Sequence, residues 1–232
     1  MRQTIANMAQ RLRLPAVCAL CKHYHNHATA VCKRCSELLV RIDAACYHCG
    51  LPMPNLQSPS CGKCIRQKPE FDRVLTSFSY EEPLRSLLRE FKFQNGLYLR
   101  TFLVGLMLDA CPAAYRPDCL VPVPMHPTRL RQRGFNQALE LCKHLEKRLL
   151  IPLDAALCQK TRNTEPQADL DAKQRQNNLH QAFSVKANNY QHVTLVDDLI
   201  TTGSTANALA SCLKASGIAQ VDVWCLARTA AR

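Results

Sequence analysis

The stretch that decides the fold of this chain is Val193-Thr194-Leu195-Val196-Asp197-Asp198-Leu199-Ile200-Thr201-Thr202-Gly203-Ser204-Thr205-Ala206. Its first four residues are apolar or β-branched, which is long enough for a strand that is buried on both faces. Two adjacent carboxylates follow, and after them a hydroxyl-rich turn around one glycine. The next residues, 206–213, favour a helix, with Gly217 as its stop. The order of strand, acidic pair, turn and helix predicts a phosphate-binding cradle in an α/β fold.

The residue types of this cradle indicate its ligand. A turn that leads into a helix directs backbone N–H groups and the positive end of the helix dipole towards an anion. The hydroxyls add hydrogen-bond donors, and the glycine lets the backbone approach the ligand closely. We therefore expect a 5-phosphate to bind Thr201, Thr202, Gly203, Ser204 and Thr205. Asp197 and Asp198 would repel that phosphate. We therefore expect them to bind sugar hydroxyls, or a Mg²⁺ that the sugar also binds.

Two other phosphate motifs are excluded by the same residues. A P-loop needs Lys after its last glycine, but Ser204 follows Gly203. The dinucleotide-binding fingerprint needs three glycines, and this turn has one. The remaining alternative is an ordinary buried strand whose turn caps a helix. The segment resembles the phosphoribosyl pyrophosphate (PRPP) signature of type I phosphoribosyltransferases, which implies that Asp197 and Asp198 hold the ribose 2′- and 3′-hydroxyls at the catalytic centre.

Length and composition set the boundaries of this interpretation. The 232 residues allow one α/β domain and a small module. The apolar run at 103–108 is far shorter than the roughly 20 residues of a membrane span. Because Arg2, Arg11 and Arg13 interrupt the N-terminus, we expect no secretion signal and a cytoplasmic protein. Disulfides are rare there, so the 14 cysteines indicate metal binding or buried thiols.

The chain has a formal net charge of +12. Two zinc sites with four thiolates each would reduce this to roughly +8, since each site carries about −2. A positive excess of this size favours a polyanionic partner, either a polyphosphate ligand or nucleic acid.

Eight of the cysteines form four C-x-x-C pairs at near-equal spacing, and each pair offers two thiolates to a tetrahedral zinc. The predicted ligands are Cys18, Cys21, Cys32, Cys35, Cys46, Cys49, Cys61 and Cys64. They make two fully ligated structural Zn²⁺ sites. Sequential pairing, first with second and third with fourth, is favoured over cross-braced pairing, but the spacing leaves both open. We expect residues 1–70 to form this double zinc ribbon and residues 71–232 to form the α/β domain.

A second segment is rich in phosphate-binding residue types. Residues 119–124 predict a strand, and the segment Met125–Gln137 after it carries three alternate arginines. One guanidinium group can donate two parallel hydrogen bonds to the oxygens of a phosphate. We therefore expect the pyrophosphate of PRPP to bind Met125, His126, Arg129 and Arg133. The alternative is a solvated basic loop. Asn136 is expected to cap the helix that follows.

The motifs of this segment, taken with others, resemble the ComF family. The resemblance rests on Val121-Pro122-Val123-Pro124-Met125-His126-Pro127, Arg129, Arg133-Gly134-Phe135-Asn136-Gln137, Thr164-Glu165-Pro166-Gln167-Ala168, Arg175, Asn178-Leu179, Ala182-Phe183 and the four C-x-x-C pairs. It implies a type I phosphoribosyltransferase-like parallel sheet flanked by helices, with a small N-terminal double zinc ribbon. It also implies a role in natural transformation, in which the protein handles incoming single-stranded DNA in the cytoplasm, with a DNA helicase as partner.

Two functions remain open on the sequence. In the first, the chain binds Mg²⁺·PRPP and handles single-stranded DNA; in the second, it transfers phosphoribose from PRPP to a nitrogen acceptor that no residue identifies. The polar segment 162–178 is either a lid that closes over PRPP or a disordered connection. The first function is favoured, because no acceptor-reading segment is evident.

Overall fold

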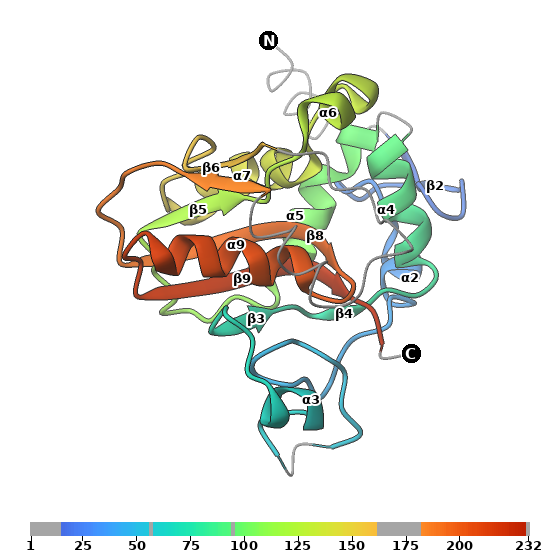
Figure 1. Ribbon diagram of the computed structural model, residues 1–232. Helices are drawn as coiled ribbons and strands as arrows, with labels where there is room; N and C mark the ends of the chain where they lie inside the picture. The colour runs from blue at the N-terminus through green and yellow to red at the C-terminus, as the bar shows by residue number, and fades with distance from the viewer. Residues whose placement is uncertain (1–14, 56–57, 94–95, 162–181, 231–232) are drawn as a thin grey trace.

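The computed structural model describes residues 15–55, 58–93, 96–161 and 182–230. The polar segment 162–178, interpreted as either a lid or a disordered connection, lies outside these residues, as do the family motifs at 164–179. The described part is built on a five-stranded sheet in which every pair of strands is parallel (Figure 1). The main order is β3 (Arg73–Leu75), β9 (Gln220–Arg228), β8 (His192–Ile200) and β5 (Cys119–Pro122), and β4 (Phe78–Ser79) also pairs with β9.

Helices cover both faces of this sheet (Figure 1). One face packs against α9 (Ser204–Ala215), and the other packs against α4 (Leu84–Phe93), α5 (Arg100–Leu108) and α7 (Gln137–Leu149). Alternate residues of β8 enter the two cores, with Leu195 on the α9 side and Val196 on the other. This parallel sheet flanked by helices confirms the predicted fold class.

One local expectation was wrong, and one helix was not predicted. The expected strand ended before the acidic pair, but β8 runs to Ile200 because β9 continues to pair with it as far as Arg228. The arginine-rich segment 125–137, for which no helix was predicted, contains helix α6 (Pro127–Arg133). His126 caps this helix with its side chain, and Gly134 ends it at a φ of 83°. The cap that Asn136 was expected to give α7 is confirmed, since its Oδ1 accepts the Ala138 N–H at 2.9 Å.

The cysteine-rich segment lies against the sheet in two separate places (Figure 1). The first ribbon, with β1 (Ala16–Val17), β2 (Tyr24–His25) and α2 (Lys33–Ser36), contributes Cys18, Val31 and Leu39 to the same core as α4. The second, with α3 (Gly62–Arg66), lies beside β3. The first ribbon thus shares the main core and does not rely on metal alone. The division at residue 70 stays a prediction.

The remaining elements are short. A 3₁₀ turn, η1 (Gly96–Leu99), precedes α5, and β6 (Cys158–Lys160) pairs antiparallel with β7 (Phe183–Val185). None of the described helices has the length and apolar character that crossing a bilayer requires.

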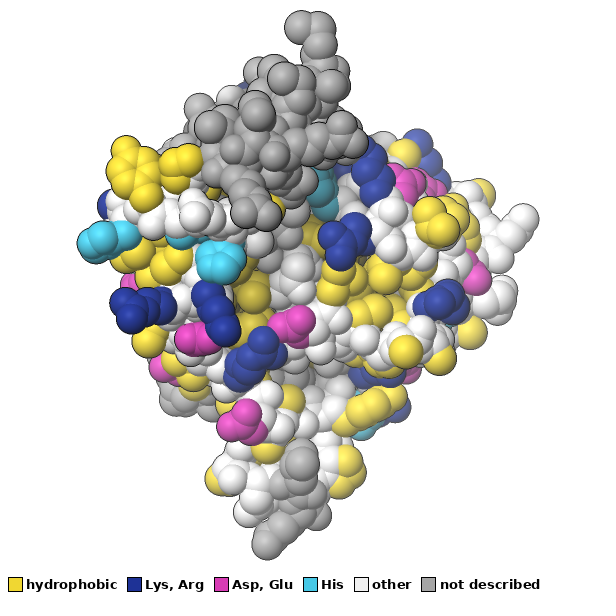
Figure 2. All heavy atoms as spheres, turned by 180° about the vertical axis from the view of Figure 1, so that it is seen from behind, with side chains coloured by type: hydrophobic (Ala, Val, Ile, Leu, Met, Phe, Trp, Pro, Cys, Tyr) yellow, Lys and Arg dark blue, Asp and Glu magenta, His cyan; other side chains and the backbone are white. Residues whose placement is uncertain are grey.

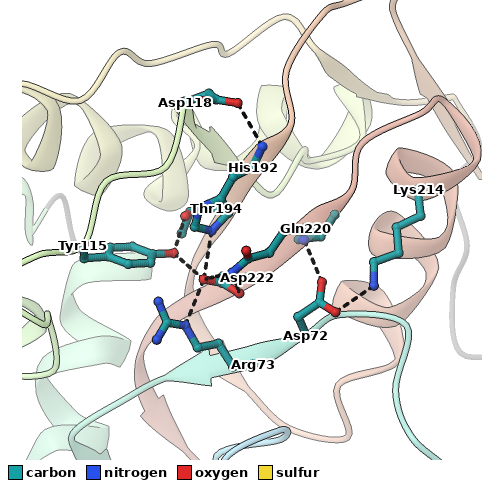
Figure 3. Close-up of polar contacts among 10 residues, drawn as sticks. Asp72, Arg73, Tyr115, Asp118, His192, Thr194, Lys214, Gln220 and Asp222 are labelled. Atoms are coloured by element: carbon teal, nitrogen blue, oxygen red, sulfur yellow. Dashed lines mark hydrogen bonds and ion pairs between the residues drawn. The ribbon is translucent and has the colours of Figure 1, made fainter.

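A buried polar cluster fixes the amino ends of β8 and β9 (Figure 3). Asp222 is fully buried, and its carboxylate accepts bonds from Arg73 Nε at 2.9 Å and Tyr115 Oη at 2.9 Å, with His192 Nε2 at 3.0 Å. Neighbouring Asp72 pairs with Lys214 of α9 at 2.9 Å. Each buried charge has a partner, so the cluster is a structural anchor at the sheet edge opposite the β8–α9 turn.

Candidate functional site

The predicted phosphate residues lie together where β8 leads into α9, with Thr201–Gly203 in the turn and Ser204 and Thr205 at the start of the helix. Gly203 has a φ of 81°, a left-handed conformation that glycine adopts without strain, and it caps α9. The hydroxyls of Thr202 and Ser204 are 2.8 Å apart, and both side chains are exposed, as are those of Thr201 and Thr205. The first N–H groups of α9 lack acceptors within the helix, so the turn presents clustered donors to solvent.

The acidic pair lies at the end of β8, directly before this turn. Asp198 is 2% exposed, forms an ion pair with Lys92 of α4, and accepts a bond from Gln137 Nε2 of α7 at 3.2 Å. Asp197 is half-buried, and its Oδ1 accepts the backbone N–H of Asp198 at 2.8 Å. Burial and then the charge of Asp198 raise the pKa of Asp197 well above its ordinary value. A bound cation would relieve this repulsion.

A pocket of about 290 Å³ adjoins the acidic pair, where α4 meets α6. Its lining residues are Lys92, Phe93, Arg129, Gln132, Arg133 and Phe135. Arg133 donates to Gln137 Oε1 at 2.7 Å, so Gln137 links this guanidinium to Asp198. Burial and then the charge of Arg129 lower the pKa of Arg133. Two guanidinium groups that repel each other in a half-buried pocket would be stabilised by an anion.

The structure thus brings some of the predicted pyrophosphate residues together and not others. Arg129 and Arg133 line the pocket beside the acidic pair. Met125 and His126 are not among its lining residues, and His126 uses Nδ1 to accept the Thr128 N–H at 3.3 Å. Lys92 was not predicted, because it belongs to helix α4 and no local pattern distinguishes it there.

The eight predicted zinc ligands form two clusters. The sulfur atoms of Cys18, Cys21, Cys32 and Cys35 lie within 4.8 Å of one another, as do those of Cys46, Cys49, Cys61 and Cys64. A tetrahedral zinc with Zn–S bonds of about 2.3 Å places its sulfurs about 3.8 Å apart. The Sγ atoms of Cys21 and Cys32 are 3.9 Å apart and those of Cys49 and Cys61 3.7 Å apart, so both donor sets fit zinc. Sequential pairing is confirmed.

Backbone N–H groups donate to sulfur atoms of both clusters. The Cys32 N–H donates to Cys18 Sγ at 3.4 Å, and the Cys61 N–H donates to Cys46 Sγ at 3.2 Å. Burial raises the pKa of Cys18, but bonds from Cys32, Cys21 and Leu20 outweigh it and lower the pKa to about 6. The full set of thiolates would provide a closed, structural tetrahedral site with no open position.

Sequence comparisons identify relatives along nearly the whole chain. A family model described as a double zinc ribbon domain matches residues 9–65. Competence protein F of Haemophilus influenzae is 34% identical over 222 residues, which cover 91% of this chain and 96% of that protein. The chain belongs to the ComF family. DNA utilization protein YhgH of Escherichia coli K12 is also 34% identical, over 94% of this ComF chain and 99% of its own length.

Other similarities are more distant. Competence protein ComFC of Bacillus subtilis is 28% identical over 86% of this ComF chain and 84% of its own length. An allosteric regulatory enzyme of purine biosynthesis matches 54% of the chain and 25% of its own, at 18% identity and a TM-score of 0.37. A Trypanosoma cruzi hypoxanthine phosphoribosyl transferase matches 56% of this chain and 64% of its own, at 15% identity and a TM-score of 0.34. Structural similarities this weak carry no argument about the site.

Proposed function

We propose that this ComF protein binds Mg²⁺·PRPP where β8 leads into α9, and that it handles single-stranded DNA beside that site. One observation carries the proposal. The hydroxyl-rich turn, the acidic pair and the arginine-lined pocket meet at the carboxyl edge of one parallel sheet, linked through Asp198, Gln137 and Arg133. Ligands of open parallel sheets bind at this edge.

Each part of PRPP has a chemically suitable place in this arrangement. The 5-phosphate fits the donors of Thr201–Thr205, the ribose hydroxyls and Mg²⁺ fit Asp197 and Asp198, and the pyrophosphate fits Arg129 and Arg133. Lys92 holds the charge of Asp198 in the ligand-free protein. Because a divalent ion competes for the same carboxylate, we expect Lys92 to be released towards the pyrophosphate when Mg²⁺·PRPP binds.

The DNA role rests on family membership and on the chemistry of the pocket. Two relatives are named for competence and for DNA utilization. Phe93 is 72% exposed at the pocket, and the Arg133 guanidinium lies 4.8 Å from its ring centroid. Aromatic and basic side chains together are typical of single-strand binding. Figure 2 shows basic side chains scattered among acidic and apolar ones on the face behind the view of Figure 1, so charge alone marks no DNA surface there. A cytoplasmic helicase partner completes the proposal.

Calorimetry tests the PRPP site directly. We expect Mg²⁺·PRPP to bind more tightly than ribose 5-phosphate, which keeps the 5-phosphate but lacks the pyrophosphate that Arg129 and Arg133 would hold. Arg133→Gln is expected to weaken the binding of PRPP more than that of ribose 5-phosphate, since only PRPP reaches that guanidinium. If PRPP and ribose 5-phosphate show no binding at millimolar concentration, the proposed site is wrong.

A titration of single-stranded oligonucleotide tests the DNA role. We expect Phe93→Ala to weaken binding about 5- to 150-fold, since stacking contributes about 1–3 kcal/mol per base. The salt dependence of the affinity should stay unchanged, because that substitution removes no cation. Tyr24→Ala is the matched control, since Tyr24 is 77% exposed on the first ribbon. Equal losses in the two variants, or affinity that does not respond to salt, would contradict the proposal.

Phosphoribosyl transfer is the second candidate, because it needs the same phosphate turn, acidic pair and arginine-lined pocket around PRPP. In that reaction a nitrogen atom bonds to ribose C1, the bond from C1 to the pyrophosphate oxygen breaks, and pyrophosphate leaves with the electron pair. Pyrophosphate release with a panel of nucleobases and oligonucleotides distinguishes the two functions. Release with any acceptor supports transfer, and its absence across the panel supports a binding role.

A further inference from the structure

We propose that Arg228 is a positioning residue that couples the second cysteine cluster to the phosphate turn, so that zinc in this cluster and phosphate at the turn stabilise each other. The phosphate part of this proposal rests on the proposed function, whereas the zinc part can be tested without it.

The guanidinium of Arg228 joins two segments that are far apart in the sequence. Arg228 ends β9 and is 7% exposed. Its Nε donates to the Cys49 carbonyl at 2.9 Å, in the second cluster. Its Nη1 donates to the carbonyls of Ile200, at 3.3 Å, and Thr201, the residues that open the phosphate turn. One side chain therefore holds both segments.

The electrostatics of Arg228 point to a need for the metal cluster. No carboxylate of the described residues forms an ion pair with this guanidinium, and its acceptors are carbonyl and hydroxyl oxygens. A buried cation without a counter-charge is costly. Four thiolates around Zn²⁺ carry a net charge of about −2. The loaded cluster that contains Cys49 would supply the missing negative charge.

At the turn, Arg228 sets the direction in which one backbone N–H group, a donor for phosphate, points. A peptide unit is planar and trans, so its C=O and N–H point in opposite directions. Because Arg228 fixes the Thr201 carbonyl, it also fixes the N–H of Thr202 in the same peptide unit. Thr229 reinforces this arrangement, since its N–H donates to the Ile200 carbonyl at 3.1 Å and its hydroxyl to the Thr201 carbonyl at 3.3 Å.

The second ribbon has little freedom to move away from the sheet. Gly50 has a φ of 66°, and a Cβ atom on it would lie 2.8 Å from Val74 Cγ1 of β3. The Val74 N–H donates to the Tyr47 carbonyl at 3.3 Å. The knuckle that carries Cys49 is thus fixed to β3, which pairs with β9. A change at the cluster is transmitted to Arg228 rather than absorbed by a loose loop.

Zinc release from the full-length protein to a chromogenic chelator tests the coupling. We expect Arg228→Met and the conservative Arg228→Lys to accelerate release of one of the two zinc equivalents at least about fivefold, the lower end of usual coupling. The other equivalent should keep its rate, because the first cluster does not contact Arg228. Arg41→Met is the matched control, since the ion pair of Arg41 is with Asp109. Unchanged release, or equal acceleration of both equivalents, would overturn the proposal.

Reciprocity provides a second readout on the unmodified protein. Saturating Mg²⁺·PRPP should raise the equilibrium affinity for that same zinc equivalent, measured by competition with the chelator, because two coupled sites stabilise each other equally. If PRPP binds but neither zinc responds, the coupling is wrong and the proposed function stands. If PRPP does not bind, the proposed function fails, and the Arg228 variants still decide whether this side chain supports the second cluster. Circular dichroism of each variant distinguishes these effects from unfolding.

Discussion

Replacing Cys18 by serine is expected to release one zinc per chain and to destabilise the whole protein, not the first ribbon alone. Cys18 is fully buried in the same core as Leu84 and Phe91 of α4, so loss of its zinc site also disturbs the packing of the sheet. Structural zinc sites contribute about 10–16 kcal/mol at neutral pH, comparable to the entire 5–15 kcal/mol stability of a typical domain. Zinc content and calorimetric melting measure the two effects.

Cys111→Ser is the control for this substitution, because Cys111 lies outside both cysteine clusters and is only partly buried. It should keep two zinc ions and melt close to the unmodified protein. A Cys18→Ser protein that retains both zinc ions, or that melts at the unmodified temperature, would contradict the assignment of the first cluster as a structural site.

Asp197→Asn is expected to weaken Mg²⁺·PRPP binding and at the same time to stabilise the ligand-free protein. A lost charge-assisted contact corresponds to about 10- to 100-fold in affinity. Asparagine keeps the Oδ1 that accepts the Asp198 N–H and removes the charge that repels the Asp198 carboxylate. We expect a gain of about 1 kcal/mol, or roughly 2–4 °C in Tm. Calorimetry measures the affinity, and melting curves measure the stability.

The pH dependence of this gain has a defined sign. Because the pKa of Asp197 is raised in the folded protein, the folded form holds its proton longer than the unfolded chain does. The stability that the Asp197 proton contributes to the folded protein is therefore fully present below the ordinary carboxyl pKa of about 4. It is lost as pH rises through the raised pKa of Asp197 in the folded protein. The advantage of Asp197→Asn should grow with pH and vanish in acid. A pH-independent gain, or an equal gain in exposed Asp43→Asn, would contradict this cause.

The sequence predicts those parts of the molecule whose physics is local. The β8–α9 turn needs a buried run, a left-handed glycine and a helix start, and residues 193–213 contain all three in order. The zinc ligands are likewise evident from their spacing, although their pairing into two sets was decided only by the folded positions of the sulfurs. The cap of α7 at Asn136 belongs to the same class.

The parts that the sequence does not predict depend on contacts between distant elements. Lys92 lies on an amphipathic helix, and only the packing of α4 against β8 brings it to Asp198. Arg228 ends a buried strand, and its position between Cys49 and Thr201 depends on the second ribbon lying beside β3. The helix α6 was missed because its seven residues were interpreted for their arginines, as a pyrophosphate site or else a solvated loop, although Pro127 and Gly134 are suitable boundary residues.

A crystal structure of the protein grown with saturating Mg²⁺ and PRPP tests the central claim most directly. We predict phosphate density bonded to the backbone N–H groups and hydroxyls of the turn at Thr202–Thr205, with the ribose hydroxyls or their Mg²⁺ at Asp197 and Asp198. PRPP bound elsewhere on the molecule, or a turn that holds only solvent at saturating ligand, would contradict it.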